Sequence, residues 1–284
     1  MTDALRAELF KVLRRRMTYI CLLVAMGLVL LFYIILWLRV RQGPDHGFRG
    51  YAEWLNLRAG LSFHNVVPYG FALERFFVTL MAVIFAGTMA GNEYDWRTVG
   101  VVVGRGVQRP QFLAAKFVSG IVFTFVAVTL AFLVALAASA WFTNLYGLDY
   151  GTIDGPWFGH ILASIVRTGF VVLPFVLMAI FFATFLRSAG QAVGAALGFY
   201  FIEGIFTGLL TSAHGWLSHV PEALFNLNGD AIIRLNGIVP GNDAGLFSTT
   251  TGIPAWRGFV VLAIWLVAFL IVGFWRFQTR DIQE

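Results

Sequence analysis

Charge and cysteine are scarce in this sequence. Of its 284 residues, 12% are charged and 59% are hydrophobic, and the mean hydropathy is +0.78. Soluble domains carry about 25% charged residues, so the composition indicates an integral membrane protein. The single cysteine, Cys21, lies within an apolar run and cannot form an intramolecular disulfide. The basic residues flank apolar runs, as membrane topology requires, so the pI near 9.7 does not indicate nucleic-acid binding.

Lysine and clustered catalytic residues are also missing. The two lysines, Lys11 and Lys116, do not follow a glycine, whereas a Walker A loop needs Gly-Lys-Ser/Thr to cradle phosphates. The chain is therefore expected to bind no ATP by such a loop and no other cofactor. Membrane enzymes need carboxylates, histidines or nucleophiles grouped at one depth, and no such group is evident, so the chain is not expected to be an enzyme. The five histidines fall in or beside the predicted external loops and are interpreted as surface residues, with no metal site.

Six apolar runs have the length of membrane spans, since about 20 residues cross a core of ~30 Å at ~1.5 Å per residue. They predict an all-α polytopic membrane protein that forms one transmembrane domain over residues 1–284. Glu74 and Arg75 are expected at the level of the outer headgroups. Short helices are expected near 51–61 and 221–235. The spans are placed at about 17–38, 71–91, 117–142, 160–186, 189–211 and 258–275, and the external loops at 39–70, 143–159 and 212–257.

The distribution of basic residues predicts the orientation. Residues 3–16 have an apolar and a basic face, which predicts an amphipathic helix at the membrane interface; a simple positive anchor for the first span is the alternative. Six spans put both termini on one side. That side holds 12 Lys and Arg residues and the opposite loops hold 7, over about twice the length. The positive-inside rule therefore predicts cytoplasmic termini in a multi-pass protein of the cell (inner or plasma) membrane.

The longest polar interruption on the predicted cytoplasmic side is residues 91–116. Tyr94, Trp96 and Val99 stand at helical spacing, followed by Val102 or Val103, which predicts a short amphipathic helix. A docking surface for a partner and an ordinary solvated connector are both compatible with this pattern. The charged residues of the segment are Glu93, Asp95, Arg97, Arg105, Arg109 and Lys116.

Two ionisable residues lie inside the predicted bilayer: Arg167 in the fourth span and Glu203 in the fifth. A charge there costs at least about 2.5–3.5 kcal/mol, so each needs a partner or a function. Counted from the turn that joins the two spans, their depths differ by about 6 Å, and we hypothesise that they pair. Such a pair either fixes helix packing or lines a translocation path.

Small residues recur in two spans. Gly190, Gly194 and Gly198 stand at intervals of four in the fifth span, and Gly87 and Gly91 repeat the spacing in the second. Small residues on one face let helix backbones approach closely in lipid. The glycines of the fifth span therefore predict a dimer interface or mobile pathway wall, or close packing within the chain.

Four residues around the 91–116 segment carry a resemblance to a known family. Thr98, Arg109 and Lys116 follow Glu93 by 5, 16 and 23 residues, between the second and third spans. In this spacing the chain resembles the permease subunits of type-two ABC transporters, exporter-type membrane subunits that pair with a separate ATPase. The family pattern is a Glu, a Gly-Thr, a Pro-x-Ser-Arg-like turn and a Lys. This sequence departs from it, because Arg97 replaces the Gly and residues 106–109 lack the Pro and Ser.

The rest of the chain agrees with the resemblance. The basic start, the six spans, the Leu186-Arg187-Ser188 turn, the long loop after the fifth span and the terminal Arg280-Asp281 extend it over essentially the whole chain.

The resemblance implies a dimer of permeases, identical or paralogous, with two ATPase subunits that bind ATP and Mg. It implies that the segment after the second span is a cytoplasmic coupling helix seated in a groove of the ATPase. It also implies that the second and fifth spans line the path. Membrane lipid is a further expected partner, and nucleic acid is not. The residues expected to dock the ATPase are Glu93, Tyr94, Asp95, Trp96, Arg97 and Thr98.

Two functions of other classes remain as alternatives. A membrane scaffold or receptor-like subunit would bind a periplasmic or extracellular partner through the external loops. A membrane-embedded enzyme is the third, and the missing catalytic cluster argues against it.

Overall fold

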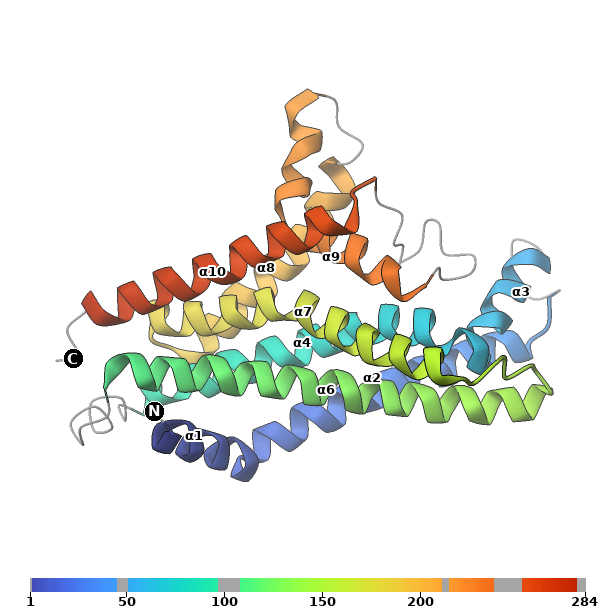
Figure 1. Cartoon of the computed structure of the whole chain (residues 1–284), viewed down its shortest axis with the longest axis horizontal. Coiled ribbons are helices and arrows are strands. Elements are labelled where there is room, and N and C mark those ends of the chain that lie inside the picture. Colours follow the sequence, from blue (N-terminus) through green and yellow to red (C-terminus); the bar gives the residue numbers. More distant parts are fainter. Residues whose placement is uncertain (1, 45–50, 97–107, 211–214, 238–251, 280–284) are drawn as a thin grey trace.

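The computed structural model describes residues 2–44, 51–96, 108–210, 215–237 and 252–279. These residues are helical or irregular, with no strand among them, which confirms the all-α prediction. The long helices run lengthwise through the molecule (Figure 1). At one end, here called the N/C end, lie the start of α1 (Thr2–Arg14), the end of α4 (Val66–Asp95), the start of α6 (Arg109–Tyr146) and the end of α10 (Ala255–Thr279). At the opposite end, here called the α3 end, lies α3 (Tyr51–Gly60).

Six helices are long and apolar enough to cross a membrane, which confirms the six predicted spans of a multi-pass transmembrane protein. Several extend beyond the predicted ends. In particular, α4 and α6 absorb both ends of the predicted 91–116 coupling segment, so the part of it between these helices is shorter than expected. The six are α2 (Arg16–Arg41), α4 (Val66–Asp95), α6 (Arg109–Tyr146), α7 (Gly155–Leu186), α8 (Ala189–Leu210) and α10 (Ala255–Thr279).

The core is built around α4 and α7. The apolar windows of these two helices are 67% and 72% buried inside the chain, whereas those of α8 and α10 are 17% buried. Stacked rings, Phe71 on Phe132 and Phe85 on Phe123, hold α4 against α6. The large apolar side chains that α2, α8 and α10 leave exposed are those expected of lipid-facing or partner-facing surfaces.

Close packing of α4 on α8 depends on the glycines of α4. A Cβ atom on Gly91 would lie 2.3 Å from the Cα of Ala189, and one on Gly87 would lie 2.7 Å from a Val193 methyl. Any side chain at Gly91 would therefore push the two backbones apart. By contrast, an added Cβ on Gly190, Gly194 or Gly198 meets nothing within 4 Å, so these three glycines do not serve packing within the described chain.

The chain reverses direction between α7 and α8 within two residues. Asp154 starts α7 by accepting a hydrogen bond from the Trp157 amide (3.0 Å), and Arg187 ends it in the left-handed region at φ 57°. Ala189 then begins α8. This tight turn makes α7 and α8 antiparallel neighbours, as the sequence predicted.

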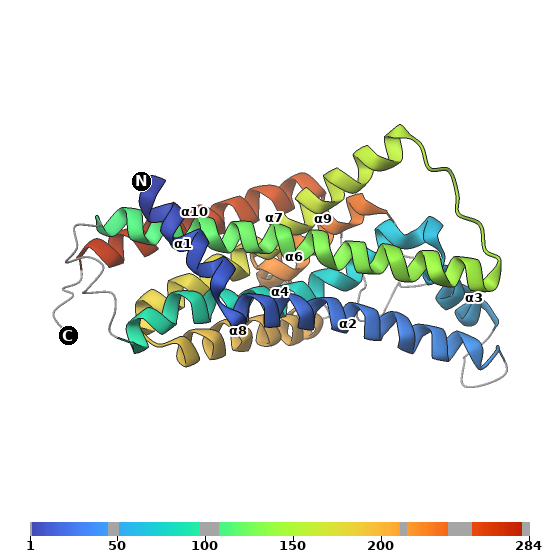
Figure 2. The ribbon, with the colours of Figure 1, turned by 90° about the horizontal axis from the view of Figure 1, so that it is seen from below.

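The N-terminal helix α1 (Thr2–Arg14) turns away from α2 and crosses the start of α6 (Figure 2). Val12 is buried against the bundle, while Phe10 and Leu13 are about 60% exposed on the outside. The helix thus contacts both the bundle and its surroundings, as an interfacial helix would.

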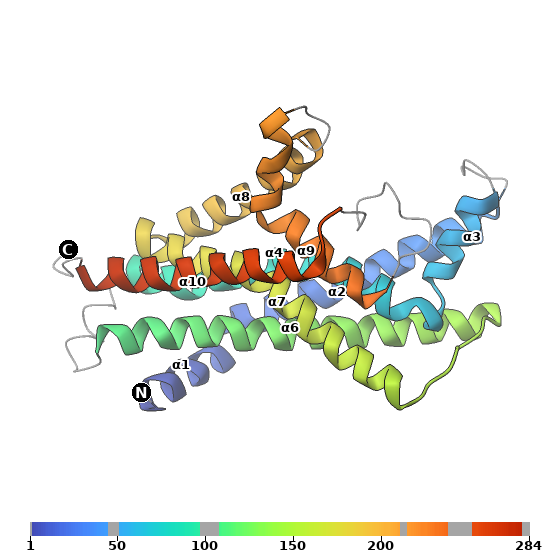
Figure 3. The same ribbon diagram turned by 45° about the horizontal axis from the view of Figure 1, so that its top comes forward.

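Short helices complete the fold. The helix predicted near 51–61 is α3 (Tyr51–Gly60), followed by η1 (Phe63–Asn65). The predicted 221–235 piece forms the end of η2 (Gly215–Ala223), then α9 (Phe225–Ile233) and η3 (Arg234–Asn236). It does not lie on the surface, since Phe225 and Ile232 are buried where α9 packs against α7 and α10 (Figure 3).

Candidate functional site

A buried group of charged residues lies at the N/C end, where α1, α4 and α6 meet. The Lys116 Nζ atom lies 2.6 Å from Glu8 Oε1 and 2.7 Å from Glu93 Oε1. All three side chains are almost completely buried. One ammonium group therefore joins the N-terminal helix to the end of one span and the start of the next.

Two further cations surround these carboxylates. The Lys11 Nζ atom lies 3.1 Å from Glu93 Oε1 and 3.3 Å from Glu8 Oε2, and an Arg15 nitrogen lies 3.8 Å from Glu93 Oε1. Partial burial acts to lower the pKa of Lys11, but Glu8 and Glu93 outweigh it, so that pKa is raised above its usual value. The five residues Glu8, Lys11, Arg15, Glu93 and Lys116 are called the inner ion cluster below.

The inner ion cluster fixes the two helix ends that flank residues 97–107. Glu93 lies in the last turn of α4, and Lys116 lies two turns inside α6. The neighbouring Asp95 ties α4 to α8, because its carboxylate accepts a hydrogen bond from the Ala189 amide (3.1 Å) at the N-terminus of α8. A carboxylate there also interacts favourably with the helix dipole. The last turn of α4, called the stem of the segment below, is thus joined to α1, α6 and α8.

The residues predicted to dock an ATPase differ in exposure. Glu93 is buried in the inner ion cluster and Tyr94 is half-buried. Asp95 is exposed but bonded to α8, and Trp96 is 63% exposed with the Arg15 guanidinium 5.8 Å from its ring. Arg97, Thr98 and the predicted coupling helix lie outside the described residues. Among the described members, Trp96 presents the largest free surface, so Glu93 is better suited to hold the segment than to touch a partner.

Arg167 and Glu203 do not form the hypothesised pair. The Arg167 guanidinium donates to the Leu235 carbonyl (3.0 Å) and the Asn236 side chain (3.4 Å). Glu203 accepts a hydrogen bond from the Asn226 amide (2.5 Å). The prediction of a pair at matched depth was wrong because it considered contacts between α7 and α8 alone. The segment from η2 to η3 folds back against both helices and gives each side chain a separate partner.

A second polar group, which sequence reasoning missed, joins α4, α8 and α9. Arg75 forms a salt bridge with Asp230 and also lies 3.3 Å from the Asn226 side-chain oxygen. Burial raises the pKa of Asp230, and the Arg75 guanidinium acts against this. Glu203 lies within electrostatic range of Arg75. Arg75, Glu203, Asn226 and Asp230 are called the α9 polar cluster; the available sequence signal was Asp230 just before the apolar run Ala231-Ile232-Ile233.

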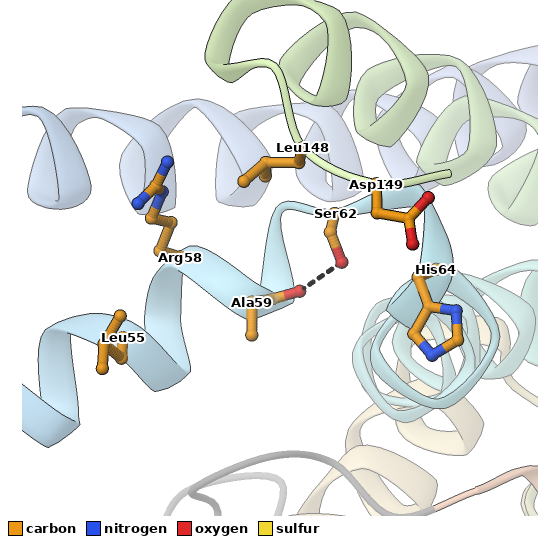
Figure 4. Close-up of a pocket in the computed structure, with 7 residues that line it drawn as sticks. All are labelled: Leu55, Arg58, Ala59, Ser62, His64, Leu148 and Asp149. Atoms are coloured by element: carbon orange, nitrogen blue, oxygen red, sulfur yellow. Dashed lines mark hydrogen bonds between the residues drawn. The ribbon is translucent and has the colours of Figure 1, made fainter. Parts of the chain in front are cut away.

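A shallow cavity of about 350 Å³ lies at the α3 end (Figure 4). Arg58 lies about 5–6 Å from the rings of Trp54 and Tyr146, which hold its cation beside the cavity. The cavity thus combines a cation, an acid and an imidazole, yet no group of three metal-ligating side chains occurs anywhere in the described ranges. Its lining residues are Leu55, Arg58, Ala59, Ser62, His64, Leu148 and Asp149.

The family described as "Protein of unknown function (DUF2705)" matches residues 60–283. The chain belongs to this family. The DUF2705 match begins at the end of α3 and includes Glu93, Lys116 and the whole α9 polar cluster. Glu8, Lys11 and Arg15, which complete the inner ion cluster, precede it.

One curated relative is a Bacillus subtilis (strain 168) protein described as "Uncharacterized protein YhcI". It is 22% identical over 213 residues, which cover 72% of this chain and 64% of the relative. The chain thus spans less than two thirds of the length of this relative.

Proposed function

We propose that this DUF2705 chain is the permease subunit of an ATP-driven exporter, with the substrate path in the membrane and ATP hydrolysis on a separate subunit. The permease lies in the cell membrane with both termini in the cytoplasm, on the predicted distribution of Lys and Arg. The N/C end of the bundle is then the cytoplasmic end, and the α3 end faces outward.

The inner ion cluster is the observation that carries the proposal. A segment that only connects two spans needs no buried anchor, because loops tolerate motion and exposure. Here Lys116 and Glu93 join the stem of the segment to α1, and Asp95 joins it to α8. A force applied to residues 97–107 would therefore move α1, α6 and α8 together. A rigid-body switch driven by another subunit requires such an arrangement.

The open face of α8 supports a dimer of two permease copies, identical or paralogous. Gly190, Gly194 and Gly198 meet no described atom of their own chain, and the apolar window of α8 is 17% buried. Small residues on a lipid-facing helix allow a second helix to approach closely. The path between two copies would then run beside α8.

Co-purification from native membranes tests the proposal. A tagged chain should carry an ATP-hydrolysing protein through purification, and Trp96→Ala should release that protein without loss of the folded permease. Tyr51→Ala is the matched control, because Tyr51 is an equally exposed aromatic residue (61% against 63%) at the α3 end. Retention of the ATPase by Trp96→Ala, or its absence from the wild-type preparation, would contradict the proposal.

The cavity at the α3 end favours a second function, a subunit that binds an outer partner. Its polar lining comes from α3, η1 and the connection after α6, all of which lie on the proposed outer side. Under this alternative, Arg58→Ala and Asp149→Ala would release an outer partner while ATPase co-purification stays intact.

A further inference from the structure

Two buried polar side chains outside both clusters lie close together between α2 and α4. Glu74 is 0% exposed and Tyr33 is 1% exposed. Neither carboxyl oxygen of Glu74 nor the Tyr33 hydroxyl has a hydrogen-bond partner in the described part of the chain. Tyr33 lies within electrostatic range of Glu74 and of Tyr69. Glu74 is enclosed by the chain, and its expected place at the level of the outer headgroups stays a prediction.

No described cation balances a charge on Glu74. Its neighbour Arg75 points to α9, where it is bonded to Asp230 and Asn226. Glu93 and Glu203 are also buried but have partners. Glu93 forms a salt bridge with Lys116, and Glu203 accepts a hydrogen bond from the Asn226 backbone amide. An unpaired carboxylate inside the membrane is energetically unfavourable, whereas a neutral carboxyl group carries no charge and supplies its own hydrogen-bond donor.

We propose that Glu74, enclosed on α4 where this helix packs on α2, is a proton-binding site that holds a neutral carboxylic acid when the α2–α4 interface is closed. Tyr33 of α2 is the titratable group within electrostatic range of Glu74, and Tyr69 of α4 lies within range of Tyr33; neither side chain can supply a positive charge. The proton has no route to water while Glu74 is fully enclosed. Separation of α2 from α4 would hydrate the acid and release the proton, so proton binding is linked to the closed interface.

The pH dependence of stability tests this site. The folded chain keeps a proton that the unfolded chain releases above about pH 4.3, so the contribution of Glu74 to stability falls as pH rises. The Tm of the wild type in detergent should therefore decline between about pH 5 and pH 8 relative to that of Glu74→Gln, which cannot ionise. Glu53→Gln, which removes an exposed carboxyl group on α3, is the control and should not show this divergence. Parallel Tm profiles for wild type and Glu74→Gln would overturn the proposal.

Infrared spectroscopy provides a second measurement on the folded wild type. A neutral carboxyl group has a carbonyl stretch separate from the bands of carboxylates, and this band should be present at pH 7. It should be lost or reduced in Glu74→Gln and should persist in Glu53→Gln. Absence of a neutral-carboxyl band from the wild type at pH 7, or a band unchanged in Glu74→Gln, would overturn the assignment.

Discussion

Lys116 Nζ lies 2.7 Å from Glu93 Oε1, although 23 residues separate them along the chain. The two residues stand on either side of residues 97–107, one on α4 and one on α6. Glu8 of α1 completes the contact on the same ammonium group. This salt bridge therefore closes the base of the segment and attaches the N-terminal helix to it.

Removal of the central cation should destabilise the protein strongly. Lys116→Met leaves two buried carboxylates short of a partner, and breaking a buried pair costs about 3–5 kcal/mol. Lys11→Met is the matched control and should cost less, because the Lys11 side chain is 40% exposed and its loss leaves both carboxylates paired with Lys116. In detergent, the Tm of Lys11→Met should lie close to that of the wild type, and the Tm of Lys116→Met should lie well below both. Equal losses for the two lysine variants would show that burial of the cluster has no energetic consequence.

The sequence predicted the helices of this fold far better than their contacts. Each apolar run became a helix because length and hydropathy are local properties, which a single sequence displays. The spacing of Glu93 and Lys116 was evident as well, but their contact with Glu8 depends on the angle at which α1 crosses α6. That angle is set by packing between distant segments, and no local pattern reports it.

The two glycine patterns should respond differently to substitution. Gly91→Ala places a methyl group against the Ala189 backbone, and such overpacking costs about 1–3 kcal/mol. Gly194→Ala should leave the stability of the single chain unchanged, because an added Cβ there meets nothing within 4 Å.

A larger residue at the open face tests the dimer separately. Gly194→Leu should reduce cross-linking between copies while each chain remains folded, as measured by detergent-resistant cross-linking and by Tm.

If Gly91→Ala proved as stable as wild type, the α4–α8 contact would not be as close as described.

Opposite charges at Arg75 and Asp230 should be strongly coupled. Arg75→Met or Asp230→Asn alone leaves a partly buried group without its partner, because the two side chains are 13% and 22% exposed, and should cost more than the ~0–1 kcal/mol of an exposed pair. The double variant should lose less than the sum. The control pair is Arg257 and Glu222, whose charged atoms lie 2.6 Å apart and whose arginine is 41% exposed, against 13% for Arg75. Its variants should change stability by about 0–1 kcal/mol. Additive losses at Arg75 and Asp230, measured by a double-mutant cycle of Tm values, would argue against the salt bridge.

The α9 polar cluster shows where sequence reasoning failed. Arg167 and Glu203 were correctly placed inside spans, yet their partners belong to the segment between α8 and α10. That segment is rich in Gly and Asn and was expected at the surface. The segment packs against the bundle through tertiary contacts, among them the burial of Phe225 and Ile232. Hydropathy alone does not distinguish such a segment from an exposed loop.

Site-specific photo-cross-linking tests the central proposal most directly. A photoreactive amino acid in place of Trp96 should capture an ATP-binding protein in native membranes, and one in place of Tyr51 should not. The captured protein should be labelled by a photoreactive ATP analogue and identified by mass spectrometry. Capture of a nucleotide-hydrolysing subunit at position 96 alone is the predicted result. Capture of none at position 96, or of the same protein at position 51, would contradict a permease driven through the segment between α4 and α6.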